Sequence, residues 1–291
     1  MGSFIELQIV HKCDQRPVDI IFIEIQNYLN KIEEELSLYQ PKSAISRLNS
    51  SGQIESISDD FLMIVKNSIE FSEKTRGAFD ISIWPLVRLV KTNFASKGQP
   101  PRDIEIQKLR NRIDYKNILI ENSSVRFKKP GMQITLDGIA KGYAVDEVSE
   151  ILLIKGFKNH LVNFSGNMRW RGSPPGAKYW KVSLWNYKTK KAIQFFEKPQ
   201  GAIASSGAEH ASYSKDQLWN HILDPRQLAP PKLWLTTSVM GPEAQVCDAL
   251  STAAFVMTEE EIKLTFNKYF SEYQVWGQDL KSELRCLVGC S

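Results

Sequence analysis

The sequence predicts an α+β fold, and three observations carry that prediction. Apolar side chains recur at helical spacing through residues 18–38, a strand-rich run extends from residue 160 to about residue 203, and residues 134–152 show a strand that turns into a helix. The chain has 291 residues, of which 42% are hydrophobic and 24% charged, as in an ordinary globular protein with a substantial core. These values favour neither a disordered chain nor a membrane protein.

The first part of the chain is predicted to be mainly helical after one strand. Residues 4–10 alternate as a strand does, and residues 18–38 place apolar side chains on one helical face. A second helix begins near Ser58 or Asp59, which are both adequate caps, and stops at Gly77.

A polar stretch, residues 92–116, then interrupts the pattern. It contains Gly and Pro and one short helix at about residues 104–110, and it is the best candidate for a boundary between two lobes. Two strand-like runs follow at residues 118–120 and 125–127.

Polar and aromatic side chains gather after the first two helices. Tyr39 precedes Gln40-Pro41, where a helix must end, so its ring is either exposed or packed beneath its own turn. Ser43 and Asn49 belong to a polar loop that could hold ligand oxygens, although the same composition is typical of any loop. For Asp80, a structural role as acceptor for loop amides is favoured over direct chemistry.

The stretch ITLDGIAKGYAVDEVSEIL, residues 134–152, organises the chain. A buried strand is predicted to turn through Asp137-Gly138 into a helix whose opening turns carry Lys141 and Gly142. A helix start has unpaired N–H groups and a positive dipole end, so this layout suits an anion, to which Lys141 would add a charge. An ordinary strand-turn-helix connection with a surface lysine explains the same pattern.

Two further stretches carry chemistry. His221 and Asp224 flank an apolar pair; a histidine can take a proton from a hydroxyl near neutral pH, and Asp224 could orient it or accept a proton itself. Asp248 and Thr252 lie one turn apart on a predicted helix that begins at Pro242, and their oxygens suit Mg²⁺. The structural alternatives are a histidine and an aspartate that stabilise a turn, and a threonine bonded back to a helix carbonyl.

Charge and cysteine content exclude some classes of protein. The net charge of +4 is spread along the chain, which gives nucleic-acid binding little support. The four cysteines have no zinc-finger spacing, and Cys286 and Cys290 could form a disulfide or remain unbonded. No apolar run approaches the ~20 residues of a membrane-spanning helix, and no export signal is visible.

Eight segments occur in the order of the motifs of one family, and together they resemble the ApbE family of magnesium-dependent FAD:protein FMN transferases. The segments and the family patterns they resemble are Met1-Gly2-Ser3 (MGT), residues 39–49 (YxPxSxxSRLN), 77–86 (GAFDxTxxPL), 134–152 (IAKG), 162–172 (VNxGGDxRxxG), 204–207 (ATSG), 221–226 (HIIDPRTG) and 248–252 (DALAT). The ordered set is more specific than any single motif.

The resemblance implies an ApbE-like, T-fold-like architecture with a mixed sheet core, packed helices and a smaller second lobe. Residues 1–275 would be one catalytic unit and residues 276–291 a C-terminal segment. FAD would be the substrate, with Mg²⁺ as cofactor and an acceptor protein with a Ser/Thr flavinylation motif as partner. FMN would be joined to the acceptor hydroxyl through a phosphoester bond, and AMP would be released.

Site residues are carried over from the family by position. His221 would be the base, assisted by Asp224. The metal ligands would be Asp248, Thr252 and the backbone carbonyl of Ala140. The expected flavin-site residues are Met1, Gly2, Tyr39, Ser43, Asn49, Asp80, Lys141, Gly166 and Ser206; the family stacks an aromatic ring on the isoalloxazine at the position of Tyr39.

The chain departs from the family patterns at several positions. Ser165-Gly166-Asn167 replaces GGD, Ser205 replaces the threonine of ATSG, and Gln227-Leu228 replaces TG. Two other functions therefore stay open, an FAD pyrophosphatase that releases FMN and AMP, and a protein that binds FAD without turnover. Family members suggest a periplasmic or envelope location, whereas a complete chain would be cytoplasmic.

Overall fold

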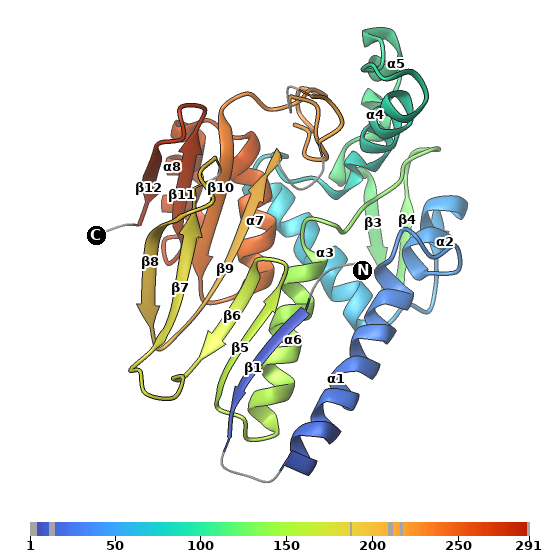
Figure 1. The fold of residues 1–291 in the computed structure, drawn as a ribbon. Coiled ribbons are helices and arrows are strands. Elements are labelled where there is room, and N and C mark those ends of the chain that lie inside the picture. The colour runs from blue at the N-terminus through green and yellow to red at the C-terminus, as the bar shows by residue number, and fades with distance from the viewer. Residues whose placement is uncertain (1–4, 12–14, 187, 209–211, 216–217, 290–291) are drawn as a thin grey trace.

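A seven-stranded antiparallel sheet forms the centre of the molecule (Figure 1). Its strands, in spatial order, are β1 (Ile5–Val10), β5 (Asn159–Phe164), β6 (Asn167–Arg171), β9 (Gln200–Gly207), β10 (Trp234–Gly241), β11 (Gln274–Asp279) and β12 (Leu284–Val288). The computed structural model describes residues 5–11, 15–186, 188–208, 212–215 and 218–289. The α+β prediction is confirmed, and the core sheet, expected to be mixed, has antiparallel pairs throughout.

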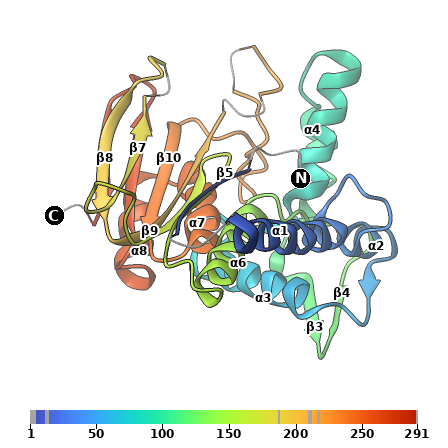
Figure 2. The same ribbon diagram turned by 60° about the horizontal axis from the view of Figure 1, so that its bottom comes forward.

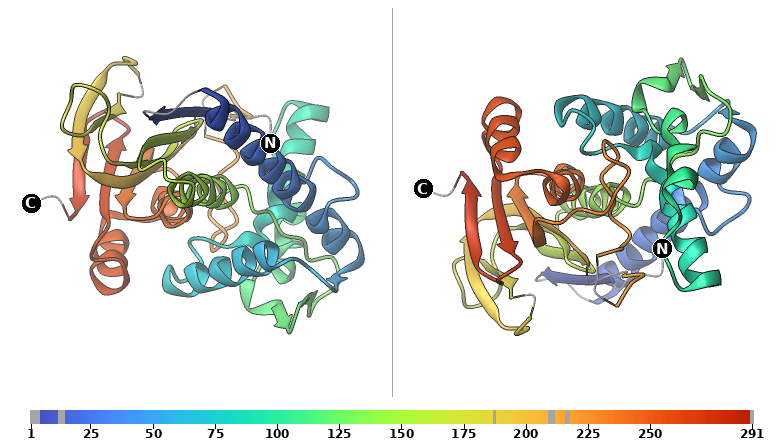
Figure 3. Two further views of the ribbon diagram at one scale, coloured as in Figure 1. Left: turned by 90° about the horizontal axis from the view of Figure 1, so that it is seen from below. Right: turned by 90° about the horizontal axis from the view of Figure 1, so that it is seen from above.

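Helices cover one face of this sheet in two layers (Figures 2 and 3). Helices α6 (Ala140–Ile154) and α7 (Ala244–Val256) lie on the sheet, and α1 (Gln15–Leu36) and α3 (Asp59–Lys74) lie outside them. Helix α8 (Glu259–Tyr269) packs near β12. The two predicted early helices are thus confirmed, and Ser58 caps α3 by accepting a hydrogen bond from the Phe61 amide.

The opposite face of the sheet is covered by a hairpin of β7 (Trp180–Trp185) and β8 (Ala192–Lys198). Side chains alternate between the two faces, as the period of a strand requires. Ala202 and Ala204 of β9 belong to the core beneath the helices, whereas Ile203 belongs to the core beneath the hairpin. The strand-rich run predicted after residue 160 is therefore confirmed.

The second region holds a three-stranded sheet and the remaining helices. Its elements are α2 (Ala44–Ser51), β2 (Gln53–Ile54), η1 (Ile81–Ile83), α4 (Trp84–Lys97), α5 (Asp103–Gln107), η2 (Arg110–Arg112), η3 (Tyr115–Asn117), β3 (Ile118–Glu121) and β4 (Ser124–Phe127). Helices α4 and α5 share an apolar cluster with the segment that carries Leu223 and Leu228. Residues 92–116 thus pack against a distant part of the chain.

The strand predicted just before Asp137 is wrong. The segment from Met132 to Leu136 is extended but unpaired in any described sheet, because the Asn49 side chain takes the place of a neighbouring strand. Its Nδ2 donates to the Ile134 carbonyl at 2.8 Å, and its Oδ1 accepts from the Ile134 amide at 2.7 Å. One side chain satisfies both polar groups of a buried residue.

The start of α7 also differs from the prediction. The helix begins at Ala244 with Glu243 as its N-cap, so Pro242 precedes the cap instead of standing in the first turn. The carboxylate of Asp146, on α6, accepts from the Ala244 and Gln245 amides at 2.9 and 2.8 Å. A side chain of one helix therefore satisfies the free N–H groups of the other.

Candidate functional site

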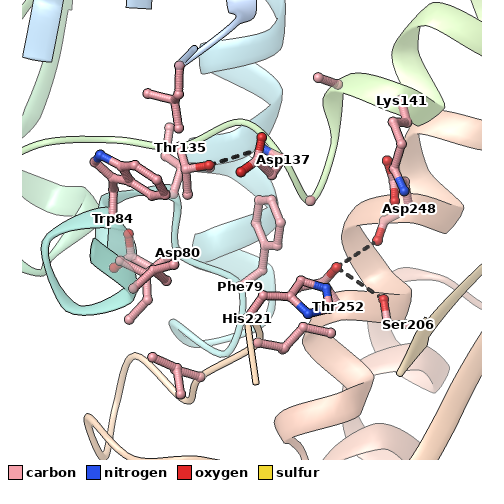
Figure 4. A pocket seen from close by; sticks show the side chains of 18 of the residues that line it. Phe79, Asp80, Trp84, Thr135, Asp137, Lys141, Ser206, His221, Asp248 and Thr252 are labelled. Atoms are coloured by element: carbon pink, nitrogen blue, oxygen red, sulfur yellow. Dashed lines mark hydrogen bonds between the residues drawn. The ribbon is translucent and has the colours of Figure 1, made fainter. Parts of the chain in front are cut away.

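A cavity of about 510 Å³ lies where the start of α6, the middle of α7, the end of β9 and the segment around His221 meet α4 (Figure 4). This volume is typical of a small-molecule site. Eight residues expected from the sequence line it, namely Tyr39, Asp80, Ala140, Lys141, Ser206, His221, Asp248 and Thr252. The fold thus brings together residues from six separate stretches of the chain.

Asp248 is the central acid of the cavity. Its residue is only 5% exposed, and its Oδ2 accepts from the Gly142 amide at 2.9 Å. Burial raises the pKa of Asp248 above its ordinary value, and the nearby Lys141 ammonium opposes that rise. The side chain has no ion pair within the described residues, so a cation beside it would stabilise its charge.

At the start of α6 one N–H group is already used by the protein itself, while the anion site that the sequence suggested there stays a prediction. The N–H group of Gly142 binds the protein's own carboxylate, and Gly142 is small because α7 crosses there, not because a ligand does. A Cβ at Gly142 would stand 2.3 Å from the Ala244 carbonyl oxygen. The helix start holds an acid, and that acid faces the cavity.

Three hydroxyl groups are linked to one another and to the backbone carbonyl of Asp248. Thr252 Oγ1 donates to the Asp248 carbonyl and lies 3.2 Å from Ser206 Oγ, as Figure 4 shows. Ser206 Oγ is in turn 2.8 Å from Ser251 Oγ. The bond from a threonine to a helix carbonyl is present, and the same oxygen still borders the cavity. An all-oxygen donor set suits a hard cation such as Mg²⁺.

Within the described ranges, three or more His, Cys, Asp or Glu side chains nowhere gather as a metal cluster. Mg²⁺ commonly uses one or two carboxylates and completes its shell with phosphate and water oxygens. A site with Asp248 as its carboxylate ligand fits that coordination preference.

His221 lines the same cavity and is half-buried. Asp224, three residues later, is only 3% exposed, and both of its oxygens accept bonds from the Arg226 guanidinium, at 3.0 and 2.9 Å. Arg226 also pairs with Glu261 at 2.7 Å and donates to the Val256 carbonyl. The observed partner of Asp224 is therefore Arg226, which ties the His221 segment to α7 and α8; a proton-transfer role for Asp224 stays a prediction.

Aromatic side chains form the other part of the cavity. The Tyr39 ring is 77% exposed at the exit of α1, so it is not packed beneath its own turn. Phe79, Trp84 and Tyr213 line the same space. Figure 4 draws the Phe79 ring between Asp137 and His221.

Asp80 borders the cavity, but its carboxylate oxygens are hydrogen-bonded to other groups of the protein. Its carboxylate accepts from the Ser82 amide, the Ser82 hydroxyl and the Tyr115 amide at 2.8, 2.7 and 3.0 Å. Burial nonetheless raises the pKa of Asp80 to about 6. The expected structural role as acceptor for loop amides is confirmed.

Several expected site residues lie elsewhere. The polar loop expected at Ser43 and Asn49 is wrong, because Ser43 is the buried N-cap of α2 and Asn49 lies within that helix, where it holds Ile134. Gly166, with φ of 97°, completes the β5–β6 turn. None of the three borders the cavity. Met1 and Gly2 lie outside the described residues, as does Cys290; Cys286 is disulfide-bonded.

Three cavity residues were missed from the sequence as ligand contacts. Asp137 had been given only a turn role, and Lys91 and Tyr213 had been given none. Lys91 lies on α4 with no motif around it, and Tyr213 follows a polar stretch, so neither carries a local signal. Only the packing of α4 against residues 213–228 brings them together.

Asn167 stands where the family pattern has an aspartate. It is 2% exposed, and its side chain lies close enough to Asp248 to lower the pKa of that carboxyl. An aspartate there would place a second negative charge close to Asp248. The neutral amide avoids that repulsion.

No helix within the described ranges is both long and apolar enough to cross a membrane.

Comparison with known proteins agrees with this arrangement. Residues 1–275 match the sequence model described as the ApbE family. The chain is 28% identical over 246 residues to an FAD:protein FMN transferase of Vibrio cholerae, covering 81% of this chain and 73% of the relative. It is 27% identical over 253 residues to an FAD:protein FMN transferase of Escherichia coli, covering 82% and 72%.

Solved structures show the same fold. The flavin transferase ApbE from Vibrio cholerae superposes with a TM-score of 0.85 at 24% identity, covering 98% of this chain and 93% of that one. The ApbE protein from Thermotoga maritima gives 0.86 at 24% identity, covering 98% and 96%.

Proposed function

Because this chain belongs to the ApbE family, we propose that it is an FAD:protein FMN transferase that requires Mg²⁺, modifies a serine or threonine hydroxyl of an acceptor protein and releases AMP. The relatives' shared name supports the transferase class. The observation that carries the proposal is one cavity that holds an exposed aromatic ring together with Asp248, Thr252 and His221.

The residues present fit a magnesium ion. Asp248 is a buried carboxylate whose pKa is raised by burial, and Thr252 and Ser206, whose hydroxyl oxygens lie 3.2 Å apart, line the same cavity. Ala140 borders the same space, so its carbonyl completes the proposed ligand set. Bound there, the metal would neutralise charge on the pyrophosphate of FAD.

Each chain residue then has a distinct part in the transfer. Tyr39 stacks on the isoalloxazine, and Lys141 attracts the phosphate oxygens. His221 accepts the proton of the acceptor hydroxyl, whose oxygen forms a bond to the phosphorus of the FMN half. The P–O bond to the AMP half breaks at the same phosphorus, and AMP leaves as the second product.

The proton-transfer part is tested with His221→Ala, and His11→Ala serves as the control because His11 packs edge-on against Phe157 and does not line the cavity. His221→Ala should bind FAD with unchanged affinity and lose acceptor modification by about 10²-fold or more. Undiminished transfer would remove His221 as the base.

Asp248→Ala tests the metal part. It should abolish the dependence of the rate on Mg²⁺ concentration, measured as acceptor modification across a magnesium titration. A variant that keeps the same magnesium dependence would place the metal elsewhere.

A further inference from the structure

The aromatic part of the cavity has two charged groups at its border that the transfer chemistry does not use. Asp137 lies in the turn before α6, and Lys91 lies on α4; both line the cavity, and Lys91 contacts the Tyr39 ring. The Asp137 amide donates to Thr135 Oγ1 at 3.2 Å, which fixes this turn (Figure 4). The two charges come from segments far apart in the sequence.

Two observations relate Lys91 to the Tyr39 ring and to the Asp137 carboxyl. Lys91 Nζ stands over the Tyr39 ring, 5.6 Å from its centroid. Desolvation raises the pKa of Asp137, although the residue is exposed at the border of the cavity, and the ammonium groups of Lys141 and Lys91 oppose that rise, so Lys91 lies within electrostatic reach of the carboxyl. Neither Asp137 nor Lys91 forms an ion pair with another described residue.

The Asp137 carboxyl is a hydrogen-bond acceptor and the Lys91 ammonium is a donor. Together they suit a flat heteroaromatic ligand that has a donor and an acceptor side by side on one edge. The pyrimidine edge of an isoalloxazine has one N–H donor, N3–H, between two carbonyl acceptors. A ring stacked on the same face of Tyr39 would displace the flexible Lys91 ammonium from that face toward the edge of the ligand.

We propose that Asp137 and Lys91 recognise the pyrimidine edge of the flavin: the Asp137 carboxyl accepts a hydrogen bond from N3–H, and the Lys91 ammonium donates to an adjacent carbonyl oxygen. This inference rests on the proposed function, because it assumes that Tyr39 stacks on the flavin. It adds two specificity residues that lie apart from the metal and the base.

The test compares binding of FAD and of N3-methyl FAD, measured by flavin fluorescence in buffer with EDTA so that no turnover occurs. The variants are Asp137→Leu, which removes the acceptor, Asp137→Asn, which keeps an acceptor oxygen, and Lys91→Met. Asp103→Asn and Lys66→Met are matched controls, because both side chains are exposed and border no part of the cavity.

The unmodified chain should bind FAD roughly tenfold or more tightly than N3-methyl FAD, as expected for a hydrogen bond to a charged group. Asp137→Leu should reduce that preference to less than about twofold, while Asp137→Asn should keep part of it. Lys91→Met should weaken both flavins equally and lower the reduction potential of the bound flavin, because a positive charge near the carbonyl stabilises the reduced anion.

Equal binding of the two flavins by the unmodified chain would overturn the inference while leaving the proposed function intact. Retained discrimination in Asp137→Leu would also overturn it. Failure of the unmodified chain to bind FAD would overturn both the inference and the proposed function.

Discussion

Gly142→Ala tests whether the close crossing of α6 and α7 builds the acidic site. A Cβ at this position would lie 2.3 Å from the Ala244 carbonyl oxygen and 2.7 Å from Gln245 Cα. These are backbone atoms, so relief needs the two helices to separate by about 1 Å to reach an ordinary contact. The same shift would lengthen the 2.9 Å bond from the Gly142 amide to Asp248 beyond hydrogen-bonding distance.

The expected sign is opposite to the usual effect of this substitution. In a helix interior without crowding, replacing glycine by alanine stabilises a protein by about 0.5–1 kcal/mol. Here overpacking should lower the free energy of unfolding by about 1–3 kcal/mol. A displacement of about 1 Å in the site should also reduce transfer by about 10²-fold.

Urea unfolding monitored by tryptophan fluorescence in EDTA gives the stability, and acceptor modification at saturating Mg²⁺ gives the activity. Gly138→Ala is the matched control, because its Cβ would meet side chains of Phe79 and Thr252 at 3.2–3.5 Å, a contact that small side-chain shifts relieve. Its stability should stay within about 1 kcal/mol of the unmodified chain. A Gly142→Ala variant as stable and active as the unmodified chain would refute the crossing argument.

The pKa of Asp80 is raised to about 6, so the native state binds this proton more tightly than the unfolded state does. The contribution of Asp80 to the free energy of unfolding should therefore fall by up to about 3 kcal/mol as pH rises from about 4 through 6. An NMR titration of the Asp80 carboxyl carbon should show a midpoint near 6, and a midpoint near 4 would contradict this. Arg226→Met should lower the free energy of unfolding by about 3 kcal/mol or more, because it leaves Asp224 buried and unpaired. The control Arg285→Met removes a surface pair and should lower it by less than about 1 kcal/mol. Equal losses of the two variants in urea unfolding would argue against a special role for the buried pair. Tyr39→Ala should weaken FAD binding roughly tenfold and leave the free energy of unfolding within about 0.5 kcal/mol of the unmodified chain, because the ring is exposed. Tyr39→Phe should retain the affinity for FAD. Unchanged FAD binding by the alanine variant in the fluorescence assay would exclude stacking of the flavin on Tyr39.

The elements that periodicity controls were predictable from the sequence. The apolar spacing in α1 and the serine cap of α3 each depend on neighbours along the chain. The strand expected before Asp137 failed because Asn49, far away in the sequence, supplies the hydrogen bonds that a neighbouring strand would have made. No local pattern distinguishes that amide from any polar loop residue.

The site residues also divide into those that local spacing predicts and those that depend on packing between distant segments. Asp248 and Thr252 share a helix, so their common face followed from spacing. The pairing of Asp224 with Arg226 was missed because the nearby His221 offered a functional partner for the same carboxylate. Asp137 and Lys91 meet at one cavity only through the packing of α4, which the sequence does not encode locally.

The most direct test of the account is to incubate the chain with FAD, Mg²⁺ and an acceptor protein that carries a Ser/Thr flavinylation motif and that another transferase has been shown to modify. Intact mass of the acceptor and chromatography of the nucleotides are then measured together. The account predicts an acceptor heavier by one FMN and an equal amount of AMP, both only when Mg²⁺ is present. Free FMN with AMP and an unmodified acceptor, or unchanged FAD, would contradict it.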